Sequence, residues 1–304
     1  IKRFPVSGYR RQNRGGKGVT GAGTKDEDFI EHMFIASTHH YILFFTDRGR
    51  VFALKVHEVP DTGRAARGRA IQNILEKDKD EKITAFLAIK EFADDKYTIM
   101  VTENGTIKKT VLSAYGNIRK GGIIAINLVD GDSLREVGLS DGNNDIVIGT
   151  SNGMAIRFNE KDVRDMGRTA TGVKGITLDK GDKVIGSIVV KRESTLLVVT
   201  DKGFGKRSEL SDYRITHRGG KGVITIKTGD KNGNLIAMKE VNDNDEFVIM
   251  TVQGMVIRQS VNDMRVMGRN TQGVRVIRLN DGDSIVDIAK IIPDEDNNGN
   301  DEEL

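Results

Sequence analysis

The chain has 304 residues, of which 37% are hydrophobic and 30% charged, and it contains 35 glycines but only 3 prolines. That apolar share is sufficient for a folded core, and the glycine excess predicts many tight turns. The absence of cysteine excludes disulfide frameworks and thiol nucleophiles. The longest apolar run, Tyr41–Phe45, is far shorter than the roughly 18 residues that a membrane helix requires. We therefore expect a soluble protein with no membrane partner.

Charge is distributed unevenly along the chain. The formal net charge is +3 at pH 7, yet residues 294–304 hold six acidic residues and no basic one. When those six acids are set aside, the formal charge of +3 rises to +9 for residues 1–293. A basic body suggests a polyanionic partner, and an ordinary solubilised surface is the alternative. We expect residues 294–304 to be a disordered acidic tail.

The first segment, about 1–38, concentrates cations on a glycine-rich sequence. Gln12-Asn13-Arg14-Gly15-Gly16-Lys17-Gly18 directly follows Arg10 and Arg11, and its last five residues recur at 218–222. Glycine lets backbone amides approach a phosphate closely, while Arg and Lys supply positive charge beside them. No Ser or Thr follows the lysine, which excludes a nucleotide-binding loop. The segment is typical of a turn that contacts phosphate.

The rest of the chain repeats one pattern, in which a short apolar run ends in Thr-x-x-Gly. The motif occurs at Thr46–Gly49, Thr102–Gly105, Thr150–Gly153, Thr200–Gly203 and Thr251–Gly254. Short β-branched runs bounded by glycine turns predict β-hairpins, and a period near 50 residues predicts a radial array of four-stranded blades. Segment 1–38 has the later elements of the pattern without the run and the turn, so we count it as a partial first unit.

These units predict one all-β domain over residues 1–293 with six blades. The expected boundaries are about 1–38 for the partial blade, and then 39–93, 94–143, 144–193, 194–244 and 245–293. Because a closed ring places equivalent turns on one rim, we expect the basic residues of these turns to contact duplex DNA. Besides Arg10, Arg11 and the heptapeptide, the candidates are Arg67, Arg69, Lys108, Lys109, Arg119, Lys120, Lys206, Arg207, Arg214, Arg218 and Lys221.

No catalytic or metal-binding set emerges from the sequence. His39-His40 lacks a carboxylate at ligand spacing, and no tyrosine lies near a general base or a metal cluster. The chain has 11 Phe, 5 Tyr and no Trp, which disfavours a stacking platform for single strands. We therefore expect a binding module without catalytic residues, metal or cofactor of its own.

The heptapeptide Gln12–Gly18 resembles the GyrA box of the DNA gyrase A C-terminal domain family, and six of its seven positions match. Asn13 replaces an arginine, which removes one charge and leaves the glycine frame. The preceding Ile-Lys-Arg-Phe-Pro and the Thr-x-x-Gly repeats extend the resemblance over residues 1–293. It implies a six-bladed β-pinwheel whose neighbouring blades exchange strands. It also implies that duplex DNA wraps around a basic rim without sequence preference.

The resemblance also carries expectations about the parent enzyme, a type II topoisomerase. Wrapping would let an A2B2 gyrase introduce negative supercoils in the bacterial, nucleoid-associated cytoplasm. The N-terminal part of gyrase A would hold the active tyrosine, and gyrase B would use ATP, with Mg²⁺ also bound outside this fragment. The fragment itself would be monomeric and would not cleave DNA. The alternatives are the related C-terminal domain of topoisomerase IV, which has a degenerate box, and a protein-interaction propeller.

Overall fold

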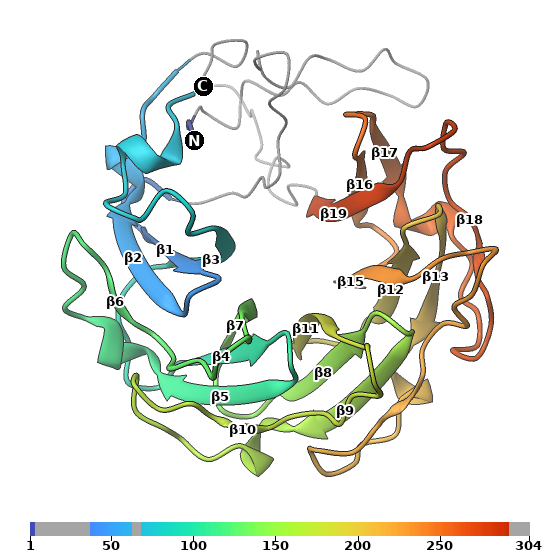
Figure 1. The fold of residues 1–304 in the computed structure, drawn as a ribbon, viewed down its shortest axis with the longest axis horizontal. Coiled ribbons are helices and arrows are strands. Elements are labelled where there is room, and N and C mark those ends of the chain that lie inside the picture. Colours follow the sequence, from blue (N-terminus) through green and yellow to red (C-terminus); the bar gives the residue numbers. More distant parts are fainter. Residues whose placement is uncertain (4–36, 63–67, 292–304) are drawn as a thin grey trace, which may run out of the picture.

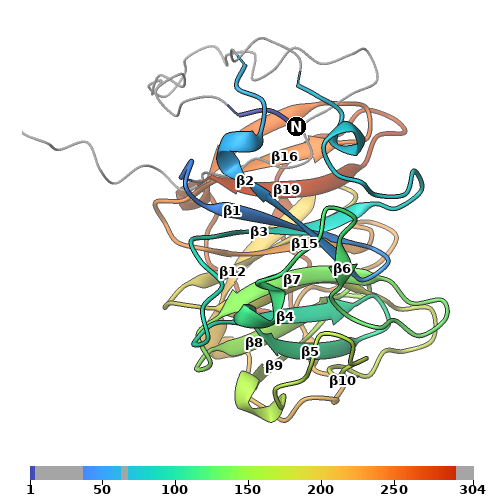
Figure 2. The ribbon, with the colours of Figure 1, turned by 90° about the vertical axis from the view of Figure 1, so that its left-hand side faces the viewer.

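The computed structural model describes residues 1–3, 37–62 and 68–291. Over this part of the chain the strands form five antiparallel sheets, arranged in an arc around a central axis (Figure 1). Short 3-10 turns connect them at Val56–Glu58, Ile71–Asn73, Leu112–Tyr115, Glu160–Asp162, Leu210–Asp212 and Val261–Asp263. Seen from the side, the sheets follow one another along the perimeter (Figure 2). The all-β prediction is confirmed.

Each sheet is built around a hairpin, with an inner strand on one side of it. From the axis outward, the first sheet is β3 (Ile83–Ile89), β1 (Tyr41–Thr46), β2 (Arg50–Lys55) and β6 (Ile123–Ile124). The second is β7 (Leu134–Ser140), β4 (Tyr97–Thr102), β5 (Thr106–Val111) and β10 (Val173–Lys174), and the third is β11 (Val184–Val190), β8 (Asp145–Thr150), β9 (Met154–Asn159) and β14 (Val223–Ile224). The fourth is β15 (Leu235–Val241), β12 (Thr195–Thr200), β13 (Phe204–Glu209) and β18 (Val274–Arg275), and the fifth is β19 (Ile285–Ile291), β16 (Glu246–Thr251) and β17 (Val256–Ser260).

The prediction of six blades is wrong, because the described residues form five sheets. The sixth blade was counted from segment 1–38, whose sequence has neither the Thr-x-x-Gly turn nor the apolar run that builds the central hairpin of the other units. Most of that segment, residues 4–36, lies outside the described residues, as does the acidic tail at 294–304.

The Thr-x-x-Gly motif closes each central hairpin for two physical reasons. All five motif glycines have positive φ, between 74° and 86°, where other residues are strained. All five threonines are at most 2% exposed, and each hydroxyl accepts the amide hydrogen of the residue that follows the glycine. The hydroxyl therefore satisfies an amide at the hairpin end.

The outermost strand of each four-stranded sheet comes from the next repeat. Ile123–Ile124 of the second repeat pairs with β2 of the first, and Val223–Ile224 of the fourth pairs with β9 of the third. The exchange continues beyond the strand, because the carbonyl of the hairpin glycine accepts an amide from the same incoming segment. Examples are Gly153 with Thr225 at 2.8 Å and Gly203 with Val276 at 2.9 Å.

The apolar core lies largely between neighbouring blades. One cluster joins Ile99 and Ile107 of the second sheet to Ile148 and Ile156 of the third, all at most 1% exposed. Another joins Leu197 of the fourth sheet to strands of the fifth. Since each blade buries one face against the next, the repeats depend on their neighbours for stability.

Two glycines with nearly equal φ but different surroundings test how much the inter-repeat contact contributes to stability. In Gly203→Ala the new Cβ would lie 2.7 Å from the carbonyl oxygen of Ile277 at a φ of +82°, whereas Gly181 has a φ of +81° and open space around its Cβ position. We expect Gly181→Ala to lower the free energy of unfolding by about 1 kcal/mol, and Gly203→Ala by at least about 3 kcal/mol. Urea denaturation followed by circular dichroism measures both. Equal losses would contradict a role for the inter-repeat contact.

Candidate nucleic-acid interface

A chain of hydrogen bonds links the loops before the exchanged strands into one track along the perimeter. We call residues 116–122, 166–172, 216–222 and 267–273 the rim loops. The amide of Asn127 donates to the carbonyl of Ala170 at 3.2 Å, that of Thr177 to Gly220 at 2.9 Å, and that of Lys227 to Thr271 at 2.9 Å. Each donor follows the preceding rim loop by five residues. Successive rim loops are therefore tied together at the outer edge of the disc (Figure 1).

Three of the rim loops contain an arginine that donates hydrogen bonds to the backbone of a neighbouring repeat. The guanidinium groups of Arg168, Arg218 and Arg269 donate to the carbonyls of Ile124, Lys174 and Ile224 at 2.7, 2.8 and 3.0 Å. Each of those carbonyls belongs to the exchanged strand of the preceding rim loop. Arg218, a predicted DNA contact, thus fixes neighbouring repeats to each other.

A second arginine series faces solvent just before the rim loops. Arg164, Arg214 and Arg265 lie eight residues before the positive-φ glycines Gly172, Gly222 and Gly273, and all three side chains are exposed. The described part of the chain offers none of these three guanidinium groups an ion-pair partner. Of these three, only Arg214 was among the predicted DNA contacts. An alignment of the repeats on the later glycine, instead of on Thr-x-x-Gly, would have identified the other two.

Two of the predicted DNA contacts are instead buried lysines. Lys108 and Lys206 are each 0% exposed, and each is the third residue of its strand, β5 or β13. The Lys108 ammonium donates to the carbonyls of Ala125, Gly167 and Arg168, the second of these at 3.2 Å. The Lys206 ammonium donates to the carbonyl of Gly268 at 2.7 Å, to that of Arg269, and to the Thr271 hydroxyl at 3.1 Å. Both lysines hold rim loops from beneath.

Their neighbours Lys109 and Arg207 are also turned inward, at 6% and 5% exposure. Lys109 forms ion pairs of 3.3 Å with Glu160 and with Asp165. Arg207 pairs with Asp243 and donates to the Met264 carbonyl at 2.5 Å. These side chains join adjacent repeats, so burial removes all four inward-facing cations from the surface available to DNA.

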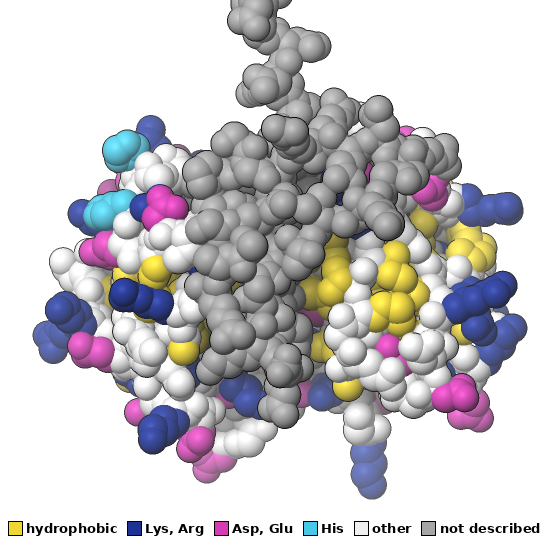
Figure 3. Space-filling view, turned by 90° about the horizontal axis from the view of Figure 1, so that it is seen from above, with side chains coloured by type: hydrophobic (Ala, Val, Ile, Leu, Met, Phe, Trp, Pro, Cys, Tyr) yellow, Lys and Arg dark blue, Asp and Glu magenta, His cyan; other side chains and the backbone are white. Residues whose placement is uncertain are grey.

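Some of the remaining predicted DNA contacts are exposed, and the others lie outside the residues that the structure describes. Arg69, Arg119, Lys120, Arg214 and Lys221 are exposed, and Lys221 pairs with Asp179. Arg10, Arg11, Arg67 and the heptapeptide Gln12–Gly18 lie outside the described residues. On the face in Figure 3, Lys and Arg side chains project from both flanks of the disc, with Asp and Glu side chains between them.

The two buried lysines should make the free energy of unfolding depend on pH. Burial lowers the pKa of Lys108 to about 7 and that of Lys206 to about 8, from 10.5. Above these values the unfolded chain binds more protons than the folded chain, so the free energy of unfolding increases with pH. We expect a gain of at least about 2 kcal/mol from pH 7 to pH 9.5. At higher pH the buried Tyr115, with its pKa raised to about 12, acts in the opposite direction.

Urea denaturation at a series of pH values measures this dependence. The double variant Lys108→Met/Lys206→Met should show a flatter curve between pH 7 and 9.5, while Lys90→Met/Lys191→Met removes two exposed lysines and should keep the wild-type slope. A wild-type curve without a rise would show that the two ammonium groups are not disfavoured by burial.

The sequence of the chain matches one known protein family over most of its length. The sequence model of the DNA gyrase C-terminal domain, beta-propeller, matches residues 1–37, 40–90, 96–139, 144–191, 194–242 and 245–291. The chain belongs to the DNA gyrase C-terminal domain family.

Relatives of known sequence agree with this assignment. The chain is 44% identical over 300 residues to the DNA gyrase A protein of Staphylococcus epidermidis, and 44% identical over 306 residues to that of Staphylococcus aureus. These matches cover 98% and 100% of the chain and 34% of each relative, so the chain spans about a third of their length.

Two solved structures resemble this gyrase C-terminal domain in fold. A DNA gyrase A C-terminal domain superposes with a TM-score of 0.81 at 26% identity, covering 96% of both chains. The C-terminal domain of a DNA topoisomerase IV superposes with a TM-score of 0.80 at 29% identity, covering 95% of this chain and 89% of the other. The fold therefore does not separate gyrase from topoisomerase IV.

The described ranges of the domain hold neither a metal centre nor a membrane span. Within residues 1–3, 37–62 and 68–291, no three His, Cys, Asp or Glu side chains gather in a way that would hold a metal ion. Over the same ranges the structure contains no helix long and apolar enough to cross a membrane.

Proposed function

We propose that this domain binds duplex DNA without sequence preference and bends it along the rim. The observation that carries the proposal is the alignment of exposed arginines on successive, hydrogen-bonded repeats. Arg164, Arg214 and Arg265 present one cation from each of three consecutive units. Contacts to phosphate position a duplex and carry no sequence information directly, so binding should be indifferent to sequence.

Bending requires that repeated contacts offset the elastic cost of the duplex. Smooth bending of a site of 20–30 bp by 40–90° costs on the order of 1–6 kcal/mol. Cations fixed at one rim position on successive blades supply attraction all along the curve, and the curvature of the disc guides the path. The heptapeptide Gln12–Gly18 would add a further cluster of phosphate contacts at one end of this path.

In the parent enzyme we assign this domain the role of wrapping DNA for negative supercoiling. The full-length gyrase A protein would contribute the DNA-cleaving tyrosine through its N-terminal part and would assemble with gyrase B in an A2B2 enzyme. ATP hydrolysis and Mg²⁺ binding would take place on those other parts, in the bacterial cytoplasm. The isolated domain would be a monomer that binds DNA and does not cleave it.

Salt dependence tests the binding mode. Each neutralised phosphate contributes a slope of about −0.9 to the logarithm of the association constant against the logarithm of the salt concentration. Replacing Arg164 and Arg214 with Gln should weaken DNA binding about tenfold and make the slope shallower by about 2. Fluorescence anisotropy with labelled duplexes at several salt concentrations measures both quantities.

The matched control removes the same number of charges away from the rim. Lys90 and Lys191 are exposed and directly follow the inner strands β3 and β11. Lys90→Gln/Lys191→Gln should leave the salt slope unchanged. It should also leave unchanged the bend angle of a duplex of about 20–30 bp, measured by energy transfer between dyes at the two ends of the duplex. If both double variants lose affinity and bending equally, the rim is not the binding track.

A further inference from the structure

One structural position decides what lies beneath each rim loop. The third residue of the second hairpin strand lies under the rim loop of the next repeat. It is Phe52 in β2, Lys108 in β5, Ile156 in β9 and Lys206 in β13, and all four are at most 1% exposed. The pairing register is the same in each sheet: Phe44 is opposite Phe52, Met100 opposite Lys108, Ile148 opposite Ile156, and Val198 opposite Lys206.

Under two rim loops the space is taken up by an ammonium group. Lys108 and Lys206 donate to the carbonyls at the second and third residues of loops 166–172 and 267–273. Under loop 116–122 an aromatic ring fills the same space, because a Cβ on Gly122 would lie 2.8 Å from the Phe52 ring. Each of these loops therefore rests on a side chain of its neighbour.

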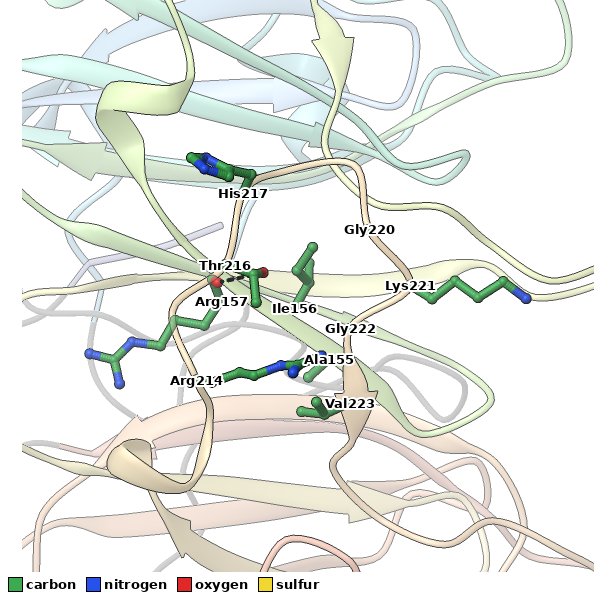
Figure 4. Close-up of a pocket in the computed structure, with 10 residues that line it drawn as sticks. All are labelled: Ala155, Ile156, Arg157, Arg214, Thr216, His217, Gly220, Lys221, Gly222 and Val223. Atoms are coloured by element: carbon green, nitrogen blue, oxygen red, sulfur yellow. Dashed lines mark hydrogen bonds between the residues drawn. The ribbon is translucent and has the colours of Figure 1, made fainter.

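A pocket of about 310 Å³ lies beside loop 216–222, where the residue beneath the loop is the shorter, uncharged Ile156. Ile156 reaches under Gly220, where a Cβ would lie 3.5 Å from its Cδ1 atom, and the aliphatic side chain ends there. Arg157, Arg214, Thr216 and His217 also line the pocket. Arg214 extends across it toward Ala155 and Val223, whereas Lys221 points outward (Figure 4).

The polar groups around this pocket suit an anion. The Arg214 guanidinium has no ion-pair partner among the described residues. The carbonyls of Gly219 and Gly220 are already engaged by Thr177, at 2.6 Å from its hydroxyl and 2.9 Å from its amide. Of the two guanidinium groups that line the pocket, Arg157 is paired with Asp145 at 2.8 Å, so Arg214 is the one that can receive an anion, while two carbonyls of the loop are turned toward the neighbouring repeat. A phosphate group binds well where positive charge is exposed and carbonyl oxygens face away.

We propose that the pocket beside loop 216–222 holds a backbone phosphate of duplex DNA, and that Ile156 keeps it open where Lys108 and Lys206 close the equivalent sites. This inference rests on the proposed function and adds to it one specific phosphate contact on the rim. Ile156 acts as a positioning residue, since it need not touch DNA. A lysine at this position would place its ammonium under the loop, next to the carbonyls of His217 and Arg218, and would occupy the space from within.

The test is a substitution that adds positive charge and nevertheless weakens binding. We expect Ile156→Lys to lower the affinity for a duplex about fivefold to tenfold and to make the salt slope shallower by about 1, the loss of one phosphate contact. General electrostatics predicts the reverse, because an added lysine strengthens attraction to a polyanion. As a control, Val252→Lys adds the same charge at a position that is 63% exposed and lies outside the rim loops, and it should not weaken DNA binding.

Hydrogen exchange of the unsubstituted domain provides an independent measurement. On addition of duplex DNA, amides of loop 216–222 should gain protection, while those of loops 166–172 and 267–273 should change little. Unchanged or tighter binding by Ile156→Lys, or equal protection in all three loops, would overturn the pocket assignment. Failure of the wild type to bind duplex DNA would instead refute the proposed function itself.

Discussion

The structure depends on one backbone contact that is repeated from unit to unit. The carbonyl of a hairpin glycine accepts an amide from the next repeat, just after that repeat has added its two-residue strand to the sheet. Thr225 donates to Gly153 in this way, and Val276 to Gly203. Because the carbonyl and the incoming backbone approach closely, a side chain at the turn has no room. A four-stranded sheet cannot be completed by the residues of one repeat, so neighbouring units fold as a connected series.

The same contact determines where the cations lie. The rim loop immediately precedes the exchanged strand, so fixing the strand also fixes the loop at the perimeter. An arginine of the loop, such as Arg218, secures the exchanged strand of the preceding rim loop by donating to the Lys174 carbonyl, while Arg214 four residues earlier remains exposed. Residues close in sequence therefore have separate tasks, one holding the repeats together and the other facing solvent.

The sequence predicted the hairpins well because their determinants are local. A buried threonine hydroxyl and a glycine with positive φ act within five residues, so Thr200–Gly203 is informative by itself. The blade count failed because a partial unit was treated as a full one, although the residues for a central hairpin were missing from it. The roles of Lys108 and Lys206 also escaped prediction. Their acceptors lie 17 to 65 residues away in sequence, and only the exchanged strand brings those acceptors close.

Because several cations are buried, the formal charge of the sequence overstates the positive charge at the surface of the domain. The formal charge of residues 1–293 counts Lys108, Lys109, Lys206 and Arg207 equally with Arg164, although the first four are at most 6% exposed. Lys108 and Lys206 satisfy carbonyl groups, and Lys109 and Arg207 are paired with carboxylates. A polyanion outside the protein is attracted chiefly by unpaired cations at the surface. DNA binding by the rim, as we propose it, would therefore depend on fewer groups than the composition indicates, and each exposed arginine would matter correspondingly more.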